Sequence, residues 1–157
     1  MPPRSKDVLT RSQRTYCMSR IQGKNTKPEM AVRRYLHGQG FRFRLHRNDL
    51  PGKPDLVLPR YRLVIFVHGC FWHRHSGCFY ATSPATRKEF WRNKLEGNIK
   101  RDHRQQKELI EQGWRILVIW ECGIRHASKT LDEIPTLITG NDVFNEWPCA
   151  PPRQREG

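Results

Sequence analysis

Two acidic and two histidine side chains have the types and the order that metal-dependent hydrolysis requires. Asp55 follows Pro54 and opens a predicted strand. His68 ends the next apolar strand, and His73 lies five residues further on. Carboxylate oxygens are preferred ligands of Mg²⁺, whose charge polarises a phosphate, and an imidazole that titrates near neutral pH takes the proton of an attacking water. We therefore predict a phosphodiester-cutting site at one sheet edge, with Glu29 of the first helix as a supporting acid.

Each of these residues also has an ordinary structural interpretation. An aspartate after a proline is commonly a turn or cap residue. Glu29 lies three residues after Thr26, which is the spacing of a helix-capping box. His68 and His73, taken singly, are also compatible with structural positions. The ordered spacing of all four around two neighbouring predicted strands favours a shared site.

A second cluster has the residue types of a structural zinc site. Residues 70–78 read Cys-Phe-Trp-His-Arg-His-Ser-Gly-Cys, and a further cysteine follows the last apolar strand. Structural zinc takes four tetrahedral sulfur and nitrogen ligands. Four candidate ligands that leave His73 free for chemistry are Cys70, His75, Cys78 and Cys122. Spacing alone does not decide between His73 and His75, and reduced thiols in a core are the alternative.

The charge balance of the 157-residue chain indicates a polyanionic partner. There are 29 Lys and Arg residues against 15 Asp and Glu, which gives a net charge of +14 and a pI near 10.2. Nucleic acid is the leading candidate partner, and an anionic membrane surface is the second. No apolar run approaches the roughly 20 residues of a transmembrane helix, and the N-terminus lacks the apolar segment of a signal peptide. We expect a reducing cytoplasm, where cysteines are thiols or metal ligands rather than disulfides.

Aromatic and basic side chains supply candidate contacts to a duplex. Phe71, Trp72 and Trp91 stand among polar neighbours, and bulky apolar side chains inserted between base pairs unstack and bend DNA. A mismatched pair costs less to open, which can itself give selectivity. Packing in the core is the ordinary alternative for each ring. Basic side chains also populate the long region predicted to be helical. A solvated helix face is the ordinary interpretation, but the net charge favours a phosphate track formed by Arg87, Lys88, Arg92, Lys94, Lys100, Arg101 and Arg104.

The elements that position these residues are predicted from apolar periodicity and from helix signals. A helix begins at Thr26 and ends before Gly38. Its buried stripe is predicted to be Ala31, Val32, Tyr35 and Leu36. Strands are predicted over residues 41–46, 55–58, 62–68 and 115–120. This order indicates an α/β fold with a central mixed sheet flanked by helices.

The remaining segments complete the predicted domain organisation. Two helices broken near Gly97 are predicted over residues 84–113, and a short helix over 130–138. Residues 26–140 then form a single domain. Residues 1–25 are interpreted as a basic arm that contacts its partner, and residues 141–157 as a loose, proline-rich tail.

Five motifs in order resemble the very short patch repair (Vsr) DNA mismatch endonucleases. They are Pro51–Asp55, Val64–His73, Pro84–Trp91, Asn98–Asp102 and Gly113–Cys122, and the resemblance spans roughly residues 10–125. The hexapeptide His-Gly-Cys-Phe-Trp-His at 68–73 is highly specific. The resemblance implies a restriction-endonuclease-like fold, a variant of the PD-(D/E)xK class. It also implies a Mg²⁺-dependent nick 5′ of the thymine in T·G mismatches that arise when 5-methylcytosine deaminates.

The resemblance also implies roles for individual residues. Asp55 matches the metal-binding aspartate, and the main-chain carbonyl of Val67 matches a second metal ligand. His73 matches the general base, while Glu29 and His68 match supporting active-site residues. The structural zinc ligands correspond to Cys70, His75, Cys78 and Cys122.

The resemblance further implies how the chain meets DNA. Phe71, Trp72 and Trp91 match aromatics that wedge beside the mismatch, and the arm from Arg11 to Thr26 matches a DNA-contacting N-terminus. The other expected DNA contacts are Arg87, Lys94, Asn98 and Arg101. We expect a monomer that acts on the nucleoid DNA of a bacterial cytoplasm, with mismatch-repair proteins as candidate partners and no membrane association.

Three other functions compete with a mismatch-nicking endonuclease. The first is a zinc-stabilised DNA-binding module without catalysis, which gives no joint role to Asp55, His73 and Glu29. The second is a nuclease whose Cys/His loop itself holds the catalytic ion. The third is an RNA-binding protein, which strong preference for duplex DNA would exclude.

Overall fold

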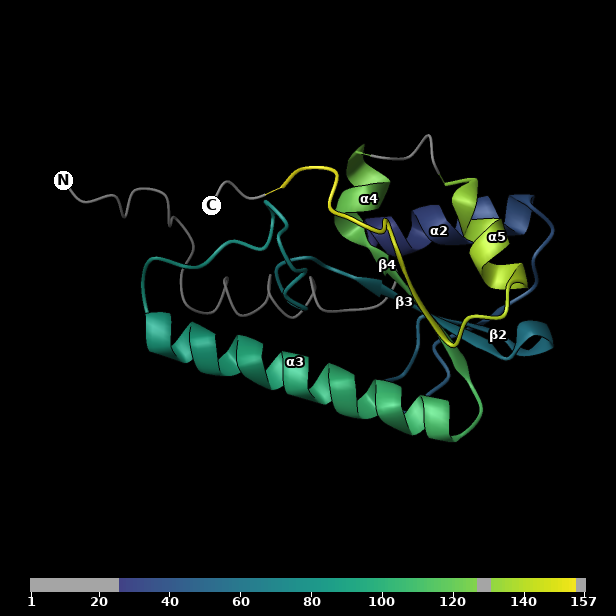
Figure 1. The fold of residues 1–157 in the computed structure, drawn as a ribbon, viewed down its shortest axis with the longest axis horizontal. Helices are drawn as coiled ribbons and strands as arrows, with labels where there is room; N and C mark the ends of the chain where they lie inside the picture. Colours follow the sequence, from purple (N-terminus) through teal and green to yellow (C-terminus); the bar gives the residue numbers. More distant parts are fainter. Residues whose placement is uncertain (1–25, 127–130, 155–157) are drawn as a thin grey trace.

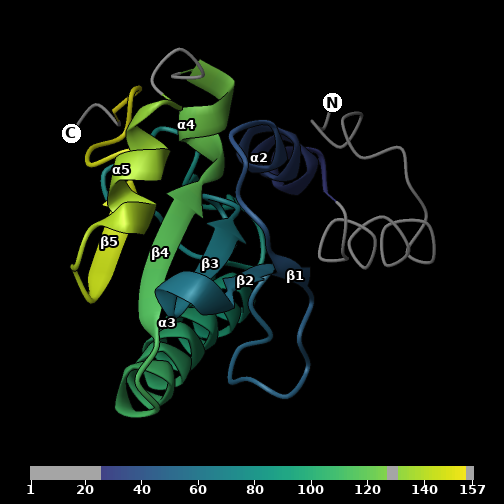
Figure 2. The same cartoon turned by 90° about the vertical axis from the view of Figure 1, so that its right-hand side faces the viewer.

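The computed structural model describes residues 26–126 and 131–154. A five-stranded mixed sheet lies at its centre, in the order β1-β2-β3-β4-β5. The long helix α3 covers one face, and α2, α4 and α5 lie on the other (Figure 1 and Figure 2). The predicted central mixed sheet flanked by helices is therefore confirmed.

The strands pair in both directions. They are β1 (Arg44–Leu45), β2 (Leu56–Leu58), β3 (Leu63–His68), β4 (Arg115–Trp120) and β5 (Phe144–Trp147). The β1/β2 and β2/β3 pairs are antiparallel, whereas β3/β4 and β4/β5 are parallel. The predicted strands over 55–58, 62–68 and 115–120 are confirmed within a residue at their ends. The strand predicted over 41–46 shrinks to β1, because His46 has a positive φ of 48° that ends the extended run.

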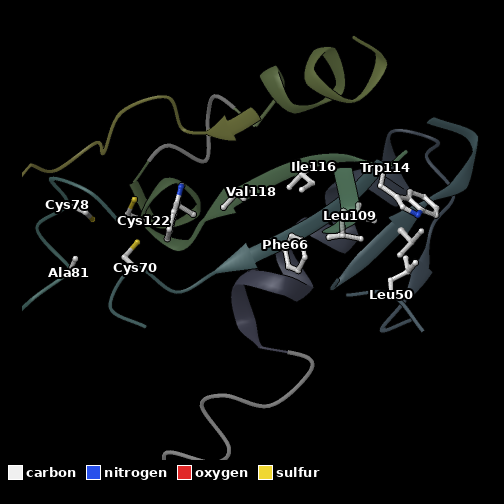
Figure 3. Packing of buried hydrophobic residues seen from close by; sticks show 13 residues of the cluster. Leu50, Phe66, Cys70, Cys78, Ala81, Leu109, Trp114, Ile116, Val118 and Cys122 are labelled. Atoms are coloured by element: carbon white, nitrogen blue, oxygen red, sulfur yellow. The ribbon is translucent and has the colours of Figure 1, made fainter. Parts of the chain in front are cut away.

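Two hydrophobic clusters lie on opposite faces of the sheet. The cluster beneath α3 includes Phe66, Leu109, Ile116 and Val118 (Figure 3). The other cluster joins the sheet to α2 and α5 through Val32, Leu36, Ile134 and Ile138. Burial of apolar area on both faces fixes the strand register, since a one-residue slip would turn each strand over.

Helix α2 (Lys27–Gly38) begins as predicted. The Thr26 hydroxyl accepts a hydrogen bond from the Glu29 amide at 3.3 Å, and Pro28 occupies the first turn. Val32 and Leu36 are buried, and Tyr35 packs partly buried against them. Ala31 is only partly buried, whereas Glu29 is 2% exposed. The helix therefore buries the acidic side chain that the sequence offered both as a capping-box residue and as a supporting acid of the site.

Helix α3 (Lys88–Glu111) is one continuous helix of 24 residues. The predicted break at Gly97 is wrong. A glycine inside a helix costs only about 1 kcal/mol relative to alanine, and this helix is held on both sides of Gly97 by buried Leu95 and Leu109. Its start is later than the predicted residue 84, because Arg87 adopts a left-handed conformation with φ of 53°.

The segment after residue 141 also differs from the prediction of a loose tail. Residues 144–147 form β5 beside β4, and Trp147 is 1% exposed. The Trp147 indole donates to Glu133 at 3.2 Å. Beyond β5, the Phe79 amide donates to the Arg153 carbonyl at 3.0 Å. Burial of one large aromatic side chain thus orders a segment that is otherwise polar and rich in proline.

Two short helices complete the fold. Helix α4 (Glu121–His126), which was not predicted, follows β4 directly, and α5 (Glu133–Thr139) replaces the helix predicted over 130–138. The predicted basic arm over 1–25 lies outside the described residues. Among those that are described, no helix is long and apolar enough to cross a membrane.

Candidate active site and metal centre

One cleft contains all four residues predicted to do the chemistry. It has a volume of about 1070 Å³ and is lined by β3, the loop after it, the start of α2 and the middle of α3. Glu29, Asp55, His68 and His73 all line it. Residues that are 44 positions apart in the chain thus share one concave surface.

Asp55 is fixed at the start of β2 by the neighbouring strand. Its Oδ2 accepts a hydrogen bond from the Val67 amide at 2.7 Å, and its own amide donates to the Ile65 carbonyl at 3.0 Å. Burial raises the pKa of Asp55 to about 6, against the opposing effect of the Val67 amide, and the charge of Glu29 raises it further. A partly buried carboxylate with a raised pKa, facing a cleft, is a candidate functional residue.

Glu29 lies beside Asp55 and is held by two cationic or hydrogen-bonding side chains. Its Oε2 accepts from the Arg33 guanidinium one helical turn on, and lies 2.7 Å from His46 Nε2. Single ligand atoms of Glu29, His46 and Asp55 all lie within 4.8 Å of one another. His46 was not predicted as a site residue, although it is the last residue of the strand predicted over residues 41–46 and lines the cleft.

The two histidines stack face to face. The rings of His68 and His73 have centroids 3.7 Å apart and planes within 4° of parallel. Burial lowers the pKa of His68 well below its usual value, and the nearby His73 adds to this effect. His73 is partly exposed, and its Nδ1 lies 2.6 Å from Asp102 Oδ2. Because a carboxylate only accepts, the proton lies on Nδ1 and leaves Nε2 as the acceptor of His73.

Asp102 is a second site residue that sequence reasoning missed. It belongs to one of the motifs that carry the family resemblance, yet nothing in its spacing assigned it a role. It lies on α3, 47 residues after Asp55, and reaches the cleft only because α3 packs across the sheet. Ligand atoms of His68, His73 and Asp102 form a second group within 4.8 Å.

The Cys/His cluster forms a separate, buried group. Ligand atoms of Cys70, His75, Cys78 and Cys122 lie within 4.8 Å of one another, and all four side chains are buried. His75 Nδ1 is 3.7 Å from Cys70 Sγ and 3.4 Å from Cys122 Sγ. A tetrahedral zinc site with bonds of roughly 2.0–2.3 Å has ligand–ligand edges of roughly 3.4–3.8 Å. The residues therefore fit such an ion, with His75 rather than His73 in the group.

The surroundings of this group are apolar and include an aromatic ring. The three cysteines lie together at one end of the cluster beneath α3 (Figure 3). The His75 ring stacks on Trp120, with centroids 4.1 Å apart. A hydrogen bond with Cys122, and then burial, raise the pKa of the Cys70 thiol, and burial raises that of Cys78. The thiols are thus poor acids in isolation, and a cation is what favours their thiolate forms.

Three aromatic side chains meet near the cleft. Phe71 contacts Trp72 and Trp91 edge-on at centroid distances of 5.1 and 5.6 Å, and Trp72 lies 5.9 Å from Trp91. All three are only partly buried. The Asn98 amide donates to the Trp72 carbonyl at 3.1 Å, which fixes the loop against α3. The structure therefore brings the three predicted wedge residues together as one surface cluster.

Three of the four other predicted DNA contacts line the cleft, and the fourth lies outside it. Lys94, Asn98 and Arg101 line the cleft, and Arg101 donates to Asn98 at 3.1 Å. Arg87 lies outside the cleft lining, with its guanidinium 4.2 Å from the centre of the Phe90 ring. The cleft therefore combines acidic and histidine groups at its base with cationic and amide groups along α3.

The chain is similar to known mismatch endonucleases and nicking enzymes. A family model described as DNA mismatch endonuclease Vsr matches residues 6–79. The chain is 52% identical over 116 residues to the type II nicking enzyme V.XorIIP of Xanthomonas oryzae pv. oryzae, covering 74% of this chain and 85% of that one. It is 43% identical over 143 residues to the DNA mismatch endonuclease Vsr of Escherichia coli, covering 91% and 88%. The type II nicking enzyme V.NmeAIP of Neisseria meningitidis is 39% identical over 132 residues, covering 84% and 94%.

Proposed function

The chain belongs to the Vsr family and is a DNA mismatch-nicking endonuclease, and we propose that it cuts 5′ of the thymine in a T·G mismatch with the help of Mg²⁺. The observation that carries the proposal is the shared cleft of Asp55, His68 and His73. T·G mismatches arise when 5-methylcytosine opposite guanine loses its amino group. The nick marks the thymine strand for repair, on the nucleoid DNA of a bacterial cytoplasm.

A cation would be held at the carboxylate side of the cleft. Asp55 would supply a partly buried carboxylate, and Val67 a main-chain carbonyl. The N–H and C=O of a strand residue point to the same side, and the Val67 N–H points at Asp55. These hard oxygen donors fit Mg²⁺, with water and phosphate oxygens completing its ligands. When bound there, Mg²⁺ supplies charge that polarises the scissile phosphate and stabilises the leaving oxygen.

His73 takes the proton of the attacking water. Its Nε2 is the accepting nitrogen, because Asp102 fixes the proton on Nδ1 at 2.6 Å. The same carboxylate stabilises the imidazolium that forms after proton transfer. His68, kept uncharged by burial, stacks on His73 at 3.7 Å and holds its ring plane without charge repulsion.

A structural zinc, if held by Cys70, His75, Cys78 and Cys122, would stabilise the loop that carries the chemistry. His73, Phe71 and Trp72 lie within this loop, between its ligands Cys70 and Cys78. Four protein ligands fill a tetrahedral site and leave no open position for a substrate. This argues against the competing function in which the Cys/His loop holds the catalytic ion.

The DNA lies across the mouth of the cleft. Phe71, Trp72 and Trp91 are placed to insert beside the mismatch, where unstacking costs least. Lys94, Asn98 and Arg101 supply contacts along α3, and Arg87 adds a phosphate contact at its start. The net charge of +14 supports a strong electrostatic contribution to binding.

Cleavage of defined duplexes tests the proposal. Two labelled duplexes that differ only in one T·G pair are incubated with Mg²⁺, and the products are separated on a denaturing gel. We expect one nick, on the thymine strand and immediately 5′ of the mismatched base. Equal cutting of the fully paired duplex would overturn the mismatch proposal, and binding without any product would favour the DNA-binding module.

A further inference from the structure

We propose that His46 is a positioning residue for the cation site, because it joins the two carboxylates Glu29 and Asp55. The inference rests on the proposed metal-dependent cleavage and adds a residue to it. His46 lines the cleft with both carboxylates. Its own side chain acts through Glu29, and its main chain is bonded to Asp55.

The contacts of His46 reach two different elements. Its Nε2 lies 2.7 Å from Glu29 Oε2 on α2, and its amide donates to the Asp55 carbonyl at 3.3 Å at the start of β2. Glu29 and Asp55 are 26 residues apart in the chain, so the two contacts of His46 connect segments that are distant in the sequence. One residue therefore sets the separation of the two acids.

The proton on this contact can be assigned from chemistry. An ionised carboxylate only accepts hydrogen bonds, so His46 Nε2 is the donor. Arg33 donates to the same Oε2, and its guanidinium nitrogen lies 3.1 Å from His46 Nε2 because both donors converge there. With two donors on one oxygen, the carboxylate cannot rotate without losing both, and its second oxygen keeps one direction.

The backbone of His46 is adapted to this role. Its φ of 48° lies in the left-handed region, which residues with a Cβ adopt rarely. Strained conformations of this kind persist where surrounding contacts fix them, and they concentrate at functional sites. Here the conformation ends β1 and turns the imidazole to Glu29. The side-chain bond and the amide bond are the two contacts that it makes possible.

The expected consequence is a weaker cation site with unchanged DNA binding. Loss of a hydrogen-bond partner behind a metal-site residue typically costs roughly 10–100-fold in metal affinity or activity. We expect His46→Asn to raise the Mg²⁺ concentration for half-maximal nicking by roughly 10-fold or more. Its affinity for mismatched DNA without Mg²⁺ should equal that of the wild type.

Two uncharged substitutions of His46 distinguish a role in positioning Glu29 from a general contribution to folding. The Gln side-chain amide reaches the position of the imidazole Nε2, so His46→Gln keeps the donor to Glu29. The Asn side chain is too short for this contact, yet Asn tolerates the left-handed conformation well. We therefore expect His46→Gln to restore most of the cation affinity that His46→Asn loses. Thermal unfolding and zinc content should be the same in both variants.

The experiment measures single-turnover nicking against Mg²⁺ concentration, and Mn²⁺ binding to the free protein by electron paramagnetic resonance. It also compares His46→Asn in the wild-type and Glu29→Ala backgrounds, where we expect no further loss in the second. Wild-type behaviour of His46→Asn in both readouts would overturn the inference. An equal loss of cation affinity in His46→Gln would also overturn it. So would a full further loss of cation affinity when His46→Asn is added to Glu29→Ala. If the wild type fails to nick at any Mg²⁺ concentration, the proposed function fails instead, and Mn²⁺ binding still decides the role of His46.

Discussion

His73 Nδ1 and Asp102 Oδ2 lie 2.6 Å apart, and this contact links the Cys/His loop to helix α3. It fixes the proton of His73 on Nδ1 and leaves Nε2 as the accepting nitrogen, and the ring is further held by stacking on His68. The proposed general base is therefore defined by two elements far apart in the sequence, and perturbing either one should reduce cleavage.

Asp102→Asn tests this link. The amide can present its NH₂ group to Nδ1 and so favour the wrong tautomer of His73. We expect the single-turnover rate to fall by roughly 10²-fold or more, within the 10²–10⁴-fold range of general-base catalysis. In a His73→Ala background, Asp102→Asn should have no further effect. A full additional loss there would show that Asp102 acts without His73.

Asp55→Asn should remove a pH dependence of stability. Burial raises the pKa of Asp55 to about 6 from 3.8 in the unfolded chain. Between these values the folded protein keeps a proton that the unfolded chain releases, so this group's stabilising contribution is present at low pH and is lost as pH rises through 6. From pH 5 to 7.5 the wild type should lose about 1–2 kcal/mol relative to Asp55→Asn.

Denaturant unfolding at these pH values, in magnesium-free buffer without chelator, measures the difference. Omitting the chelator avoids stripping the ion proposed for the Cys/His group from either protein. The Asn side-chain oxygen can still accept the hydrogen bond that the Val67 amide donates to Asp55 at 2.7 Å in the wild type. If the free energies of unfolding of the two proteins differed by the same amount across the pH range, the raised pKa of Asp55 in the folded protein would be contradicted.

Cys122→Ser should lose the zinc. Serine is a poor zinc ligand, and structural zinc contributes folding free energy directly. We expect about one zinc fewer per chain by elemental analysis and a lower thermal unfolding temperature. Cys149→Ser is the matched control, because Cys149 is exposed and outside the four-residue group. Full zinc content in the Cys122→Ser protein would remove that residue from the ligand set.

Lys94→Ala should reduce the salt dependence of DNA binding. Each phosphate contact releases condensed counterions, so losing one lowers the slope of log K against log salt by about 1. Lys107→Ala, on the same helix but outside the cleft lining, serves as the control. Fluorescence anisotropy at several salt concentrations measures both. An unchanged slope for Lys94→Ala, or an equal change in Lys107→Ala, would place the duplex elsewhere.

Local signals predicted the elements that position the site. The capping of α2 and the buried strands β2, β3 and β4 rest on short-range patterns, and the structure reproduces them. The predicted break at Gly97 and the loose tail after 141 are wrong for one reason. Tertiary packing of Leu95, Leu109 and Trp147 outweighs the local preference for irregular structure.

The site itself was predictable only in part. Asp55, His68 and His73 have chemistry and spacing that mark them, and the family resemblance adds roles. Asp102 and His46 gave no comparable signal, since their importance depends on which elements pack together. Asp102 is brought in by α3, and His46 by a left-handed turn at the end of β1. Long-range packing of this kind has no short sequence signature.

The single-turnover nicking rate of Asp55→Ala on a T·G duplex at saturating Mg²⁺, measured beside its affinity for the same duplex, tests the central claim most directly. We predict binding close to that of the wild type and no detectable nick, because Asp55 is the carboxylate proposed to hold the cation at the cleft. Nicking at the wild-type rate by this variant would contradict the proposed active site.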